Sequence, residues 1–219
     1  MVKTLLLSLL TLSMSISPLT AAAAVPTVKL EVPIYRQEKR LSCEAVDLKM
    51  ALEFKGVSPI SEDQMMALMG VDASQRNGNT WGDPDLVYVG DVSGAQNKTG
   101  YGVHWDPVAR AAQNFRAESY AFSGWSVQRL AEEITAGNPI IIWGVYGKRP
   151  RKDSWVTPEG KTVHAWVGEH SRVVVGFTGS VDNPQTFILN DSLVGQIRWS
   201  TKRLKSDWAT FGNSGVVVK

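Results

Sequence analysis

The order of helical and strand-like segments along the chain is the feature that most limits its fold. Helical patterns come first, at residues 43–55, 61–69, 106–115 and 127–135. Apolar strand-like runs follow, at residues 140–146, 171–177, 186–189, 195–200 and 215–218. Helices that gather early and strands that gather late do not fit a sheet built from alternating βαβ units. The sequence therefore predicts an α+β fold, with N-terminal helices packed on a C-terminal antiparallel β-sheet.

Capping and breaking residues define the ends of the first helices. The segment that starts at Cys43 has apolar residues at every fourth position and ends at Gly56, which indicates an amphipathic helix. Ser61 and Gln64 have the spacing of a capping box, so a second helix is expected to begin there and to end at Gly70.

Three other segments have no helical period. Residues 28–35 alternate apolar and polar side chains, and Pro33 places this expected strand at a sheet edge. Residues 71–104 are rich in Gly, Asn, Asp and Ser and predict a long loop, which is usually functional in a domain of this size. Residues 148–162 are polar and suit a hairpin or a rim loop.

Composition and charge exclude several classes of protein. Hydrophobic residues make up 43% of the 219 residues and charged residues 20%, which is ordinary for a globular domain and argues against disorder. The formal net charge of +2 gives no electrostatic reason to expect nucleic acid or an anionic membrane as a partner. The single cysteine excludes an intramolecular disulfide and a four-cysteine zinc site.

Residues 1–24 have the pattern of a secretory signal peptide. Lys3 gives a basic start, a short apolar stretch follows, and small residues lead up to Ala24. The apolar stretch is shorter than the roughly 20 residues that a spanning helix needs, although an uncleaved anchor stays an alternative. We therefore expect one mature domain at 25–219, secreted or associated with a cell wall, without stable membrane insertion after cleavage.

Cys43 is the residue of this chain that is best suited to catalysis. It stands at the start of the first predicted helix, where the helix dipole and free backbone N–H groups favour a thiolate. A lone cysteine beside an apolar face is nevertheless more often part of the core. Its assignment therefore depends on the residues that accompany it.

Three further residues have positions that suit thiol catalysis. Gln37 lies six residues before Cys43, where its amide and the Cys43 backbone N–H can point at one oxygen as an oxyanion hole. His170 begins a predicted strand and suits a general base, and Asp191 ends the next strand and can orient the imidazole. Asn190 is a lesser candidate for that third role. Taken singly, each has an ordinary structural explanation as a loop, sheet-edge or turn residue.

The order of these residues is that of papain, and the chain resembles a known family. It is similar to the papain-like cysteine peptidases related to the bacteriocin leader peptidases, numbered thirty-nine among the cysteine peptidase families, and most of all to secreted stand-alone relatives in Gram-positive bacteria. The stretches that carry the resemblance are 32–37, 41–46, 54–56, 83–84, 89–91, 101–103, 137–143, 168–177 and 189–191. They extend over nearly the whole expected mature chain.

The resemblance implies a papain-like fold and a role for each of four residues: Cys43 as nucleophile, His170 as base, Asp191 as orienting carboxylate and Gln37 as oxyanion donor. The chain departs from many relatives at the positions that directly follow Cys43 and Asp191. It has Glu44 where they have glycine and Ser192 where they have proline. Neither change removes a catalytic group. The first is expected to alter how closely a substrate passes the thiol.

The resulting hypothesis is a secreted bacterial thiol protease, a hydrolase that cleaves an amide bond through a Cys-His-Asp triad and a thioester intermediate. Relatives fused to exporters cut leader peptides after paired glycines, a specificity that we do not expect to transfer to a chain of this type. A cell-wall peptide, a secreted peptide or a protein stay open as substrates. The alternative is a non-catalytic module that binds a peptide or a wall fragment on the same fold.

No cofactor, metal ion or nucleic-acid partner is expected. His104 and His164 have no matching role, the chain contains no His-x-x-x-His spacing, and a zinc site would need carboxylates. The basic run at 148–152 is more typical of a solvated loop than of a binding patch. Most of the eight tryptophans are expected in the core, while three in polar stretches are candidates to line a cleft: Trp81, Trp155 and Trp166.

Overall fold

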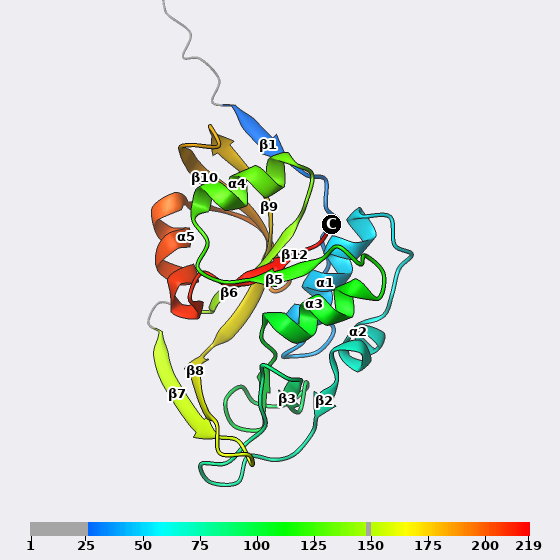
Figure 1. Ribbon diagram of the computed structural model, residues 1–219, viewed down its shortest axis with the longest axis vertical. Helices are drawn as coiled ribbons and strands as arrows, with labels where there is room; N and C mark the ends of the chain where they lie inside the picture. Colours follow the sequence, from blue (N-terminus) through cyan, green and yellow to red (C-terminus); the bar gives the residue numbers. More distant parts are fainter. Residues whose placement is uncertain (1–25, 148–149) are drawn as a thin grey trace, which may run out of the picture.

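The computed structural model describes residues 26–147 and 150–219, and within them it forms the predicted α+β fold (Figure 1). The helices are α1 (Cys43–Phe54), α2 (Glu62–Met69), α3 (Trp105–Gln113), α4 (Val127–Thr135), α5 (Thr201–Trp208) and a short 3-10 helix, η1 (Ala209–Phe211). The strands are β1 (Thr27–Lys29), β2 (Val71–Asp72), β3 (Tyr88–Gly90), β4 (Gly100–Gly102), β5 (Tyr120–Phe122), β6 (Ile140–Val145), β7 (Arg151–Val156), β8 (Thr162–Val167), β9 (Glu169–Gly179), β10 (Pro184–Asp191), β11 (Gly195–Ser200) and β12 (Gly215–Val217). The leader expected at 1–24 lies outside the described residues, as does part of the basic run.

A seven-stranded antiparallel sheet organises the molecule around β9. Its strand order is β11-β10-β9-β6-β12-β5, and β1 also pairs with β9. Strand β6 pairs with the first part of β9 and β1 with its second part, while β10 follows the opposite edge. The long β9 thus begins beside β6 and leads from the lower part of the molecule in Figure 1 up to β1.

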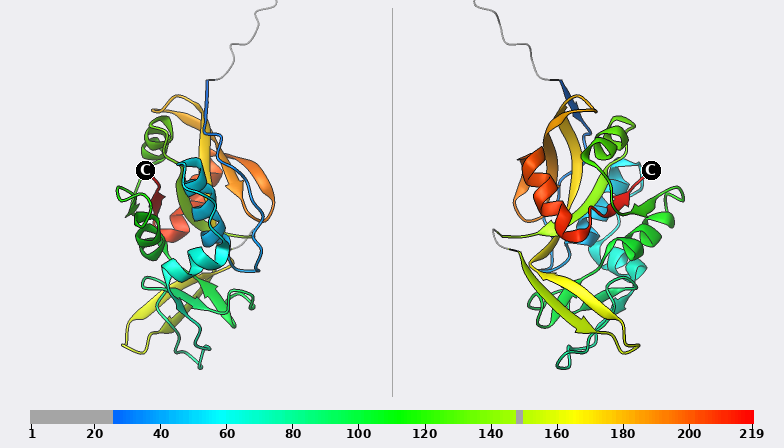
Figure 2. Two further views of the ribbon diagram at one scale, coloured as in Figure 1. Left: turned by 90° about the vertical axis from the view of Figure 1, so that its right-hand side faces the viewer. Right: turned by 60° about the vertical axis from the view of Figure 1, so that its left-hand side comes forward.

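The alternation of side chains along β9 builds a core on each face of the sheet. Val173 and Val175 pack with α1, α2 and α3, whereas Val174 packs with α4 and α5 on the opposite face. This is the period of two that a strand imposes. The helices therefore cover both faces, as the two views of Figure 2 show. The helix α5, which the sequence patterns did not predict, completes the second face.

Local end signals confirm the helix predictions. In α2 the Ser61 hydroxyl accepts from the Gln64 backbone N–H at 3.2 Å, and the Gln64 side chain accepts from the Ser61 N–H at 3.0 Å. Gly70 ends this helix with a φ of 77°, a conformation that favours glycine. Ser126 caps α4 in the same way, by accepting from the backbone N–H of Arg129.

Two segments differ from the sequence prediction. The expected strand at 28–35 is shorter, because only β1 pairs with the sheet; the buried Asn190 side chain instead donates to the carbonyls of Val32 and Pro33. The expected loop at 71–104 contains the small sheet β2-β3-β4. Beside it, β7 and β8 form the hairpin that the polar segment predicted.

An ion pair joins this hairpin to the small sheet's segment. The Arg76 guanidinium donates to both Asp153 oxygens, at 2.8 and 3.1 Å, and lies over the rings of Trp81 and Trp155. Both tryptophans are buried in a separate small core, so neither is the cleft residue that the sequence suggested.

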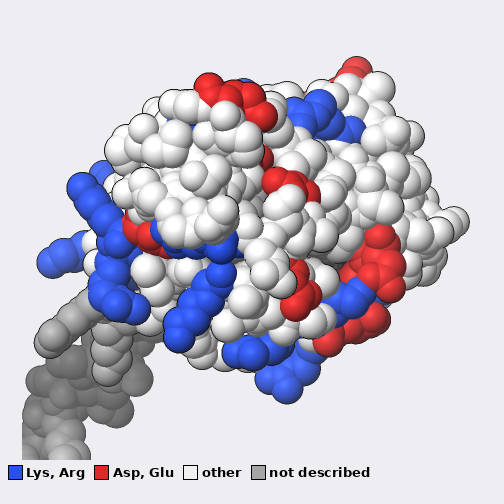
Figure 3. All heavy atoms as spheres, turned by 90° about the horizontal axis from the view of Figure 1, so that it is seen from below, with Lys and Arg blue, Asp and Glu red and all other residues white. Residues whose placement is uncertain are grey.

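The outer surface shows no dominant charge on the face viewed from below. Acidic and basic side chains are both scattered over it in Figure 3, in keeping with the near-neutral charge of the chain. Among the described residues, no helix combines the length and the apolar character that crossing a bilayer requires.

Candidate active site

Cys43 is the first residue of α1 and is almost fully buried. The preceding Ser42 turns its hydroxyl to Glu62 of α2 rather than to the α1 backbone, and its carbonyl accepts from the Val46 N–H at 3.1 Å. The Cys43 thiol lies 3.2 Å from Oε2 of Glu44 and donates to it. The helix start thus fixes the thiol beside an acidic side chain.

His170 and Asp191 lie next to each other on two neighbouring strands. His170 is the second residue of β9 and Asp191 the last of β10, and the antiparallel pairing of these strands brings them together. His170 Nε2 is 3.1 Å from Asp191 Oδ1, although the angle is not that of a hydrogen bond. Catalytic hydrogen bonds are often poorly aligned without substrate.

Asp191 is held in place from several directions. Its Oδ2 accepts from Arg172 Nε at 2.7 Å, and its Oδ1 accepts from the Leu193 N–H at 2.9 Å. Burial acts against the charge of this carboxylate, but His170, Arg172 and the Leu193 N–H outweigh it and hold its pKa well below the usual range. Asp191 is therefore ionised at neutral pH.

The imidazole of His170 is correspondingly biased toward its neutral form. Burial lowers its pKa, Asp191 acts in the opposite direction, and the positive charge of Arg172 lowers it again. A neutral imidazole is the form that can accept a proton from a thiol.

The electrostatic surroundings of Cys43 differ from those expected at a helix start. Burial raises the pKa of the thiol well above its ordinary value, and the carboxyls of Glu44, Glu169 and Asp47 raise it further, against one backbone hydrogen bond at Ser171. The expectation that the helix terminus leaves this thiol acidic is therefore wrong for the structure. Three nearby carboxyl groups and loss of water outweigh the helix dipole.

The same cluster perturbs its own members. Burial raises the pKa of Glu44 to about 7, against a hydrogen bond from the Val103 N–H at 2.8 Å. Burial, together with Glu44 and Asp47, raises the pKa of Glu169 well above the usual range. Burial and like-charge repulsion thus favour the protonated form of both carboxyl groups.

A small cavity of about 60 Å³ brings three of the four predicted residues together. Its lining comprises Gln37, Arg40, Leu41, Cys43, Gln96, Tyr101, Tyr146, Glu169, His170 and Leu193. Asp191 lies on the other side of His170, where it lines a larger groove together with Arg172. The three groups thus follow the order of a catalytic triad, although the hydrogen bond of the thiol goes to Glu44.

Gln37 reaches the cavity but has its amide engaged. Its Nε2 donates to the carbonyls of Lys39 and Arg40, both at 2.8 Å, and its Oε1 accepts from the Ser192 hydroxyl at 2.8 Å. The side chain thus joins the loop before Cys43 to the residue after Asp191. To donate to a substrate oxygen, the amide has to release one of these carbonyls.

The remaining candidates lie elsewhere. The Asn190 amide binds the chain near Pro33, and its Oδ1 accepts from Gln196. His104 pairs with Asp85 at 2.5 Å, and His104 and the exposed His164 line a separate cavity of about 770 Å³. Neither histidine lines the cavity that contains Cys43.

Three residues of the site carry roles that the sequence patterns did not assign. Glu44 and Glu169 were visible only as neighbours of Cys43 and His170, and their convergence depends on how β9 lies over the start of α1. Arg172 was visible as the one charged residue within the apolar strand at 171–177. A lone charge in a buried strand is a signal for a buried ion pair.

Comparison with known families agrees with this fold. The profile of the Peptidase_C39 like family matches residues 29–216, most of the chain. The chain belongs to this family. Comparison with curated proteins finds no significant match.

Solved structures of C39 peptidases share the fold. A protein from Bacillus anthracis described as a C39-like peptidase superposes with a TM-score of 0.75 at 20% identity, covering 89% of this chain and 98% of that one. The peptidase domain of Streptococcus ComA, a bifunctional ABC transporter of a quorum-sensing pathway, superposes with a TM-score of 0.50 at 16% identity, covering 86% of this chain and 98% of that one. At these identities the likeness establishes the C39 peptidase fold, and the family membership supports cysteine peptidase activity.

Proposed function

We propose that this C39-like protein is a secreted thiol hydrolase that cleaves an amide bond, with Cys43, His170 and Asp191 as its triad. The observation that carries the proposal is the contact of His170 Nε2 with Asp191 Oδ1 at 3.1 Å, beside a cavity that His170 and Cys43 line together. The pattern of residues 1–24 supports secretion. A peptide is the substrate class that fits the family, and we include cell-wall peptides among the candidates.

In the proposed reaction His170 accepts the proton of the Cys43 thiol, and the sulfur attacks the carbonyl carbon of the substrate. The carbon–nitrogen bond then breaks, His170 returns the proton to the leaving amine, and a thioester remains on Cys43. A water molecule gives a proton to His170, attacks the thioester and releases the acid, while the sulfur takes back the proton. Asp191 stabilises the imidazolium in each half of the cycle.

The charge of Glu44 decides how readily the first step occurs. A carboxylate 3.2 Å from the sulfur opposes thiolate formation, whereas a protonated Glu44 does not. Because the pKa of Glu44 is raised to about 7, a substantial share of the molecules carries a neutral Glu44 at neutral pH. Proton uptake by this side chain thus permits a thiol with raised pKa to react.

The same carboxylates support a second candidate function, a non-catalytic module that binds a peptide or a cell-wall fragment. In that case Cys43 stays a buried thiol, its pKa raised by burial and its neighbours, and the amide of Gln37 stays bound to backbone carbonyls. The two functions differ in whether a thioester forms, so an activity assay separates them.

The test is cleavage of a diverse peptide mixture, mapped by mass spectrometry. We expect wild-type protein to produce new termini, and Cys43→Ala and His170→Ala to produce none, since members of one catalytic unit fail almost equally. His104→Ala and His164→Ala are the matched histidine controls and should retain cleavage. Binding of peptides by the wild type without any cleavage would favour the non-catalytic module, and loss of cleavage in a control variant would move the base to that histidine.

A further inference from the structure

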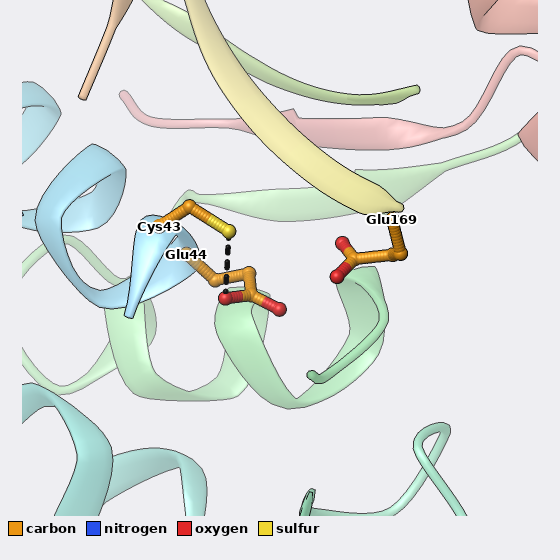
Figure 4. Close-up of side chains that lie close together, drawn as sticks. All are labelled: Cys43, Glu44 and Glu169. Carbon is orange, nitrogen blue, oxygen red and sulfur yellow. Dashed lines mark hydrogen bonds between the residues drawn. The ribbon is translucent and has the colours of Figure 1, made fainter. Parts of the chain in front are cut away.

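Cys43, Glu44 and Glu169 form a buried cluster that the proposed reaction does not fully use. One possible ligand atom from each residue, a sulfur and two carboxylate oxygens, lies within 4.8 Å of the other two. Figure 4 shows the thiol and the Glu44 carboxyl at the start of α1, with Glu169 pointing toward them from the first residue of β9. Two distant segments of the chain thus present three ligand-type groups to one point.

Glu169 supplies the observation that this cluster is incomplete. Its side chain is buried, and its Oε1 has no hydrogen-bond partner among the described residues. A buried carboxylate without a partner is costly, and it is normally paired, protonated or bound to a metal. The nearby cation Arg172 is already engaged by Asp191 and Asp207. Besides a proton, a ligand with positive charge would complete this cluster.

The backbone leaves room for the two carboxyl groups to converge. A Cβ at Gly102 would lie 2.6 Å from Oε2 of Glu169 and 2.6 Å from Oε1 of Glu44. Any other residue at this position would separate the two groups. The glycine of β4 thus keeps a gap that a small occupant can share with both carboxylates.

We propose that Cys43, Glu44 and Glu169 bind a divalent transition-metal ion of the zinc class, which blocks the nucleophile while it is bound. A thiolate with two carboxylates is a donor set that zinc accepts, with a water molecule in the fourth position. The adjoining cavity of about 60 Å³ has room for an ion and a water molecule. The soft sulfur favours such an ion over calcium or magnesium, which take oxygen ligands.

The regulatory consequence rests on the proposed function, because it needs Cys43 to be the nucleophile. A metal ion uses the same sulfur lone pair that attacks a substrate carbonyl, so metal binding and catalysis exclude each other. The metal site itself does not depend on activity. Its existence can therefore be measured on protein that cleaves nothing.

The test is titration of the purified chain with Co²⁺ as a spectroscopic probe for the zinc class. A thiolate bound to Co²⁺ produces a charge-transfer band in the near ultraviolet, and because the chain has one cysteine, any such band reports Cys43. We expect one Co²⁺ per chain, displaced by Zn²⁺, and slower alkylation of Cys43 in the presence of Zn²⁺. Calorimetry with Zn²⁺ gives the stoichiometry independently.

Three variants make the result specific. Cys43→Ser should abolish the band, and Glu169→Gln should weaken binding about tenfold or more, since even outer-shell partners of a metal change its affinity about 10- to 100-fold. Glu159→Gln alters an exposed glutamate of the β7–β8 turn and should leave binding unchanged. Thermal unfolding of each variant identifies any that fail to fold, and Glu44→Gln replaces Glu169→Gln in that event.

Two outcomes overturn the proposal: no charge-transfer band and no stoichiometric Zn²⁺ uptake by folded wild-type protein, or affinities in Glu169→Gln and Glu44→Gln equal to that of the wild type. Failure of the peptidase assay with metal binding intact would refute the proposed function and leave the site. Peptide cleavage without metal binding would support the proposed function and refute the metal site.

Discussion

Arg172 and Asp191 form a buried ion pair that connects the candidate triad to the rest of the sheet. Arg172 Nε donates to Asp191 Oδ2 at 2.7 Å, while the other oxygen of Asp191 faces His170. The guanidinium also lies 3.6 Å from a carboxylate oxygen of Asp207 and stacks over the ring of Trp199. The carboxylate that orients the imidazole is thus itself oriented by an arginine.

Replacing Arg172 should change both stability and the titration of His170. Arg172→Ala leaves Asp191 buried without its partner, so we expect a loss of about 3–5 kcal/mol in unfolding free energy. Because the arginine charge lowers the pKa of His170, its removal should raise that pKa, which NMR titration of the imidazole can follow. Arg172→Lys keeps the positive charge but loses the hydrogen bond from Nε to Asp191. The pKa of His170 should therefore stay close to that of the wild type, while part of the stability is lost.

Arg203→Ala is the matched control for this prediction. Arg203 stacks over the same Trp199 ring, at 4.3 Å, but forms no ion pair with Asp191. It should leave the pKa of His170 unchanged. An unaltered His170 titration in Arg172→Ala would show that Arg172 serves the fold alone.

Glu44→Gln should make the Cys43 thiol more reactive. The substitution keeps the shape of the side chain and removes the charge 3.2 Å from the sulfur, so the pKa of the thiol should fall. Iodoacetamide alkylation at a pH below the pKa of the thiol should then be faster in the variant than in the wild type. Glu53→Gln, on the same helix but paired with Tyr35, is the control. Equal pH midpoints in the two variants would contradict the prediction.

The pH dependence of stability should report the same carboxyl group. Because burial raises the pKa of Glu44 to about 7 from an ordinary value near 4.5, the folded chain binds more protons than the unfolded chain between these pH values. The contribution of Glu44 to stability is therefore present below about pH 4.5 and is lost as pH rises toward 7. The loss is on the order of 3 kcal/mol.

A comparison with Glu44→Gln separates this effect from titrating groups that do not interact with Glu44. Asp191, Asp85 and His170 titrate in both proteins, so their contributions largely cancel in the difference. Denaturant unfolding at pH 5, 6, 7 and 8 should show the variant gaining stability relative to wild type as pH rises. A difference that stays constant across this range would mean that Glu44 is not protonated in the folded protein.

The sequence was most informative where structure depends on local signals. The capping box at Ser61 and the cap at Ser126 define helix starts through neighbouring residues, and both predictions are confirmed. The contact of His170 with Asp191 follows from the pairing of two consecutive strands, which the spacing also indicated. The catalytic roles of these residues stay predictions until activity is measured.

Features that depend on distant segments could not be predicted in the same way. The meeting of Glu44 with Glu169 requires β9 to lie over the start of α1, and no local pattern encodes that packing. This packing raises the pKa of the Cys43 thiol, whereas the helix terminus alone was expected to lower it. Burial and the nearby carboxyl charges act on the thiol at the same short range as the helix dipole. The small sheet β2-β3-β4 was missed because its strands have only two or three residues each.

Gln37 provides the sharpest test of whether the site can stabilise an oxyanion. If its amide leaves the carbonyls of Lys39 and Arg40 to bind the substrate oxygen, Gln37→Ala should lower turnover about 10²- to 10³-fold. Alkylation of Cys43 should change little, since iodoacetamide builds no oxyanion. Gln113→Ala removes a similar amide–carbonyl bond, to Ser119, and should affect neither rate. Should alkylation fall as far as turnover, the role of Gln37 is to hold the loop before Cys43, because only a displaced thiol would slow both reactions alike.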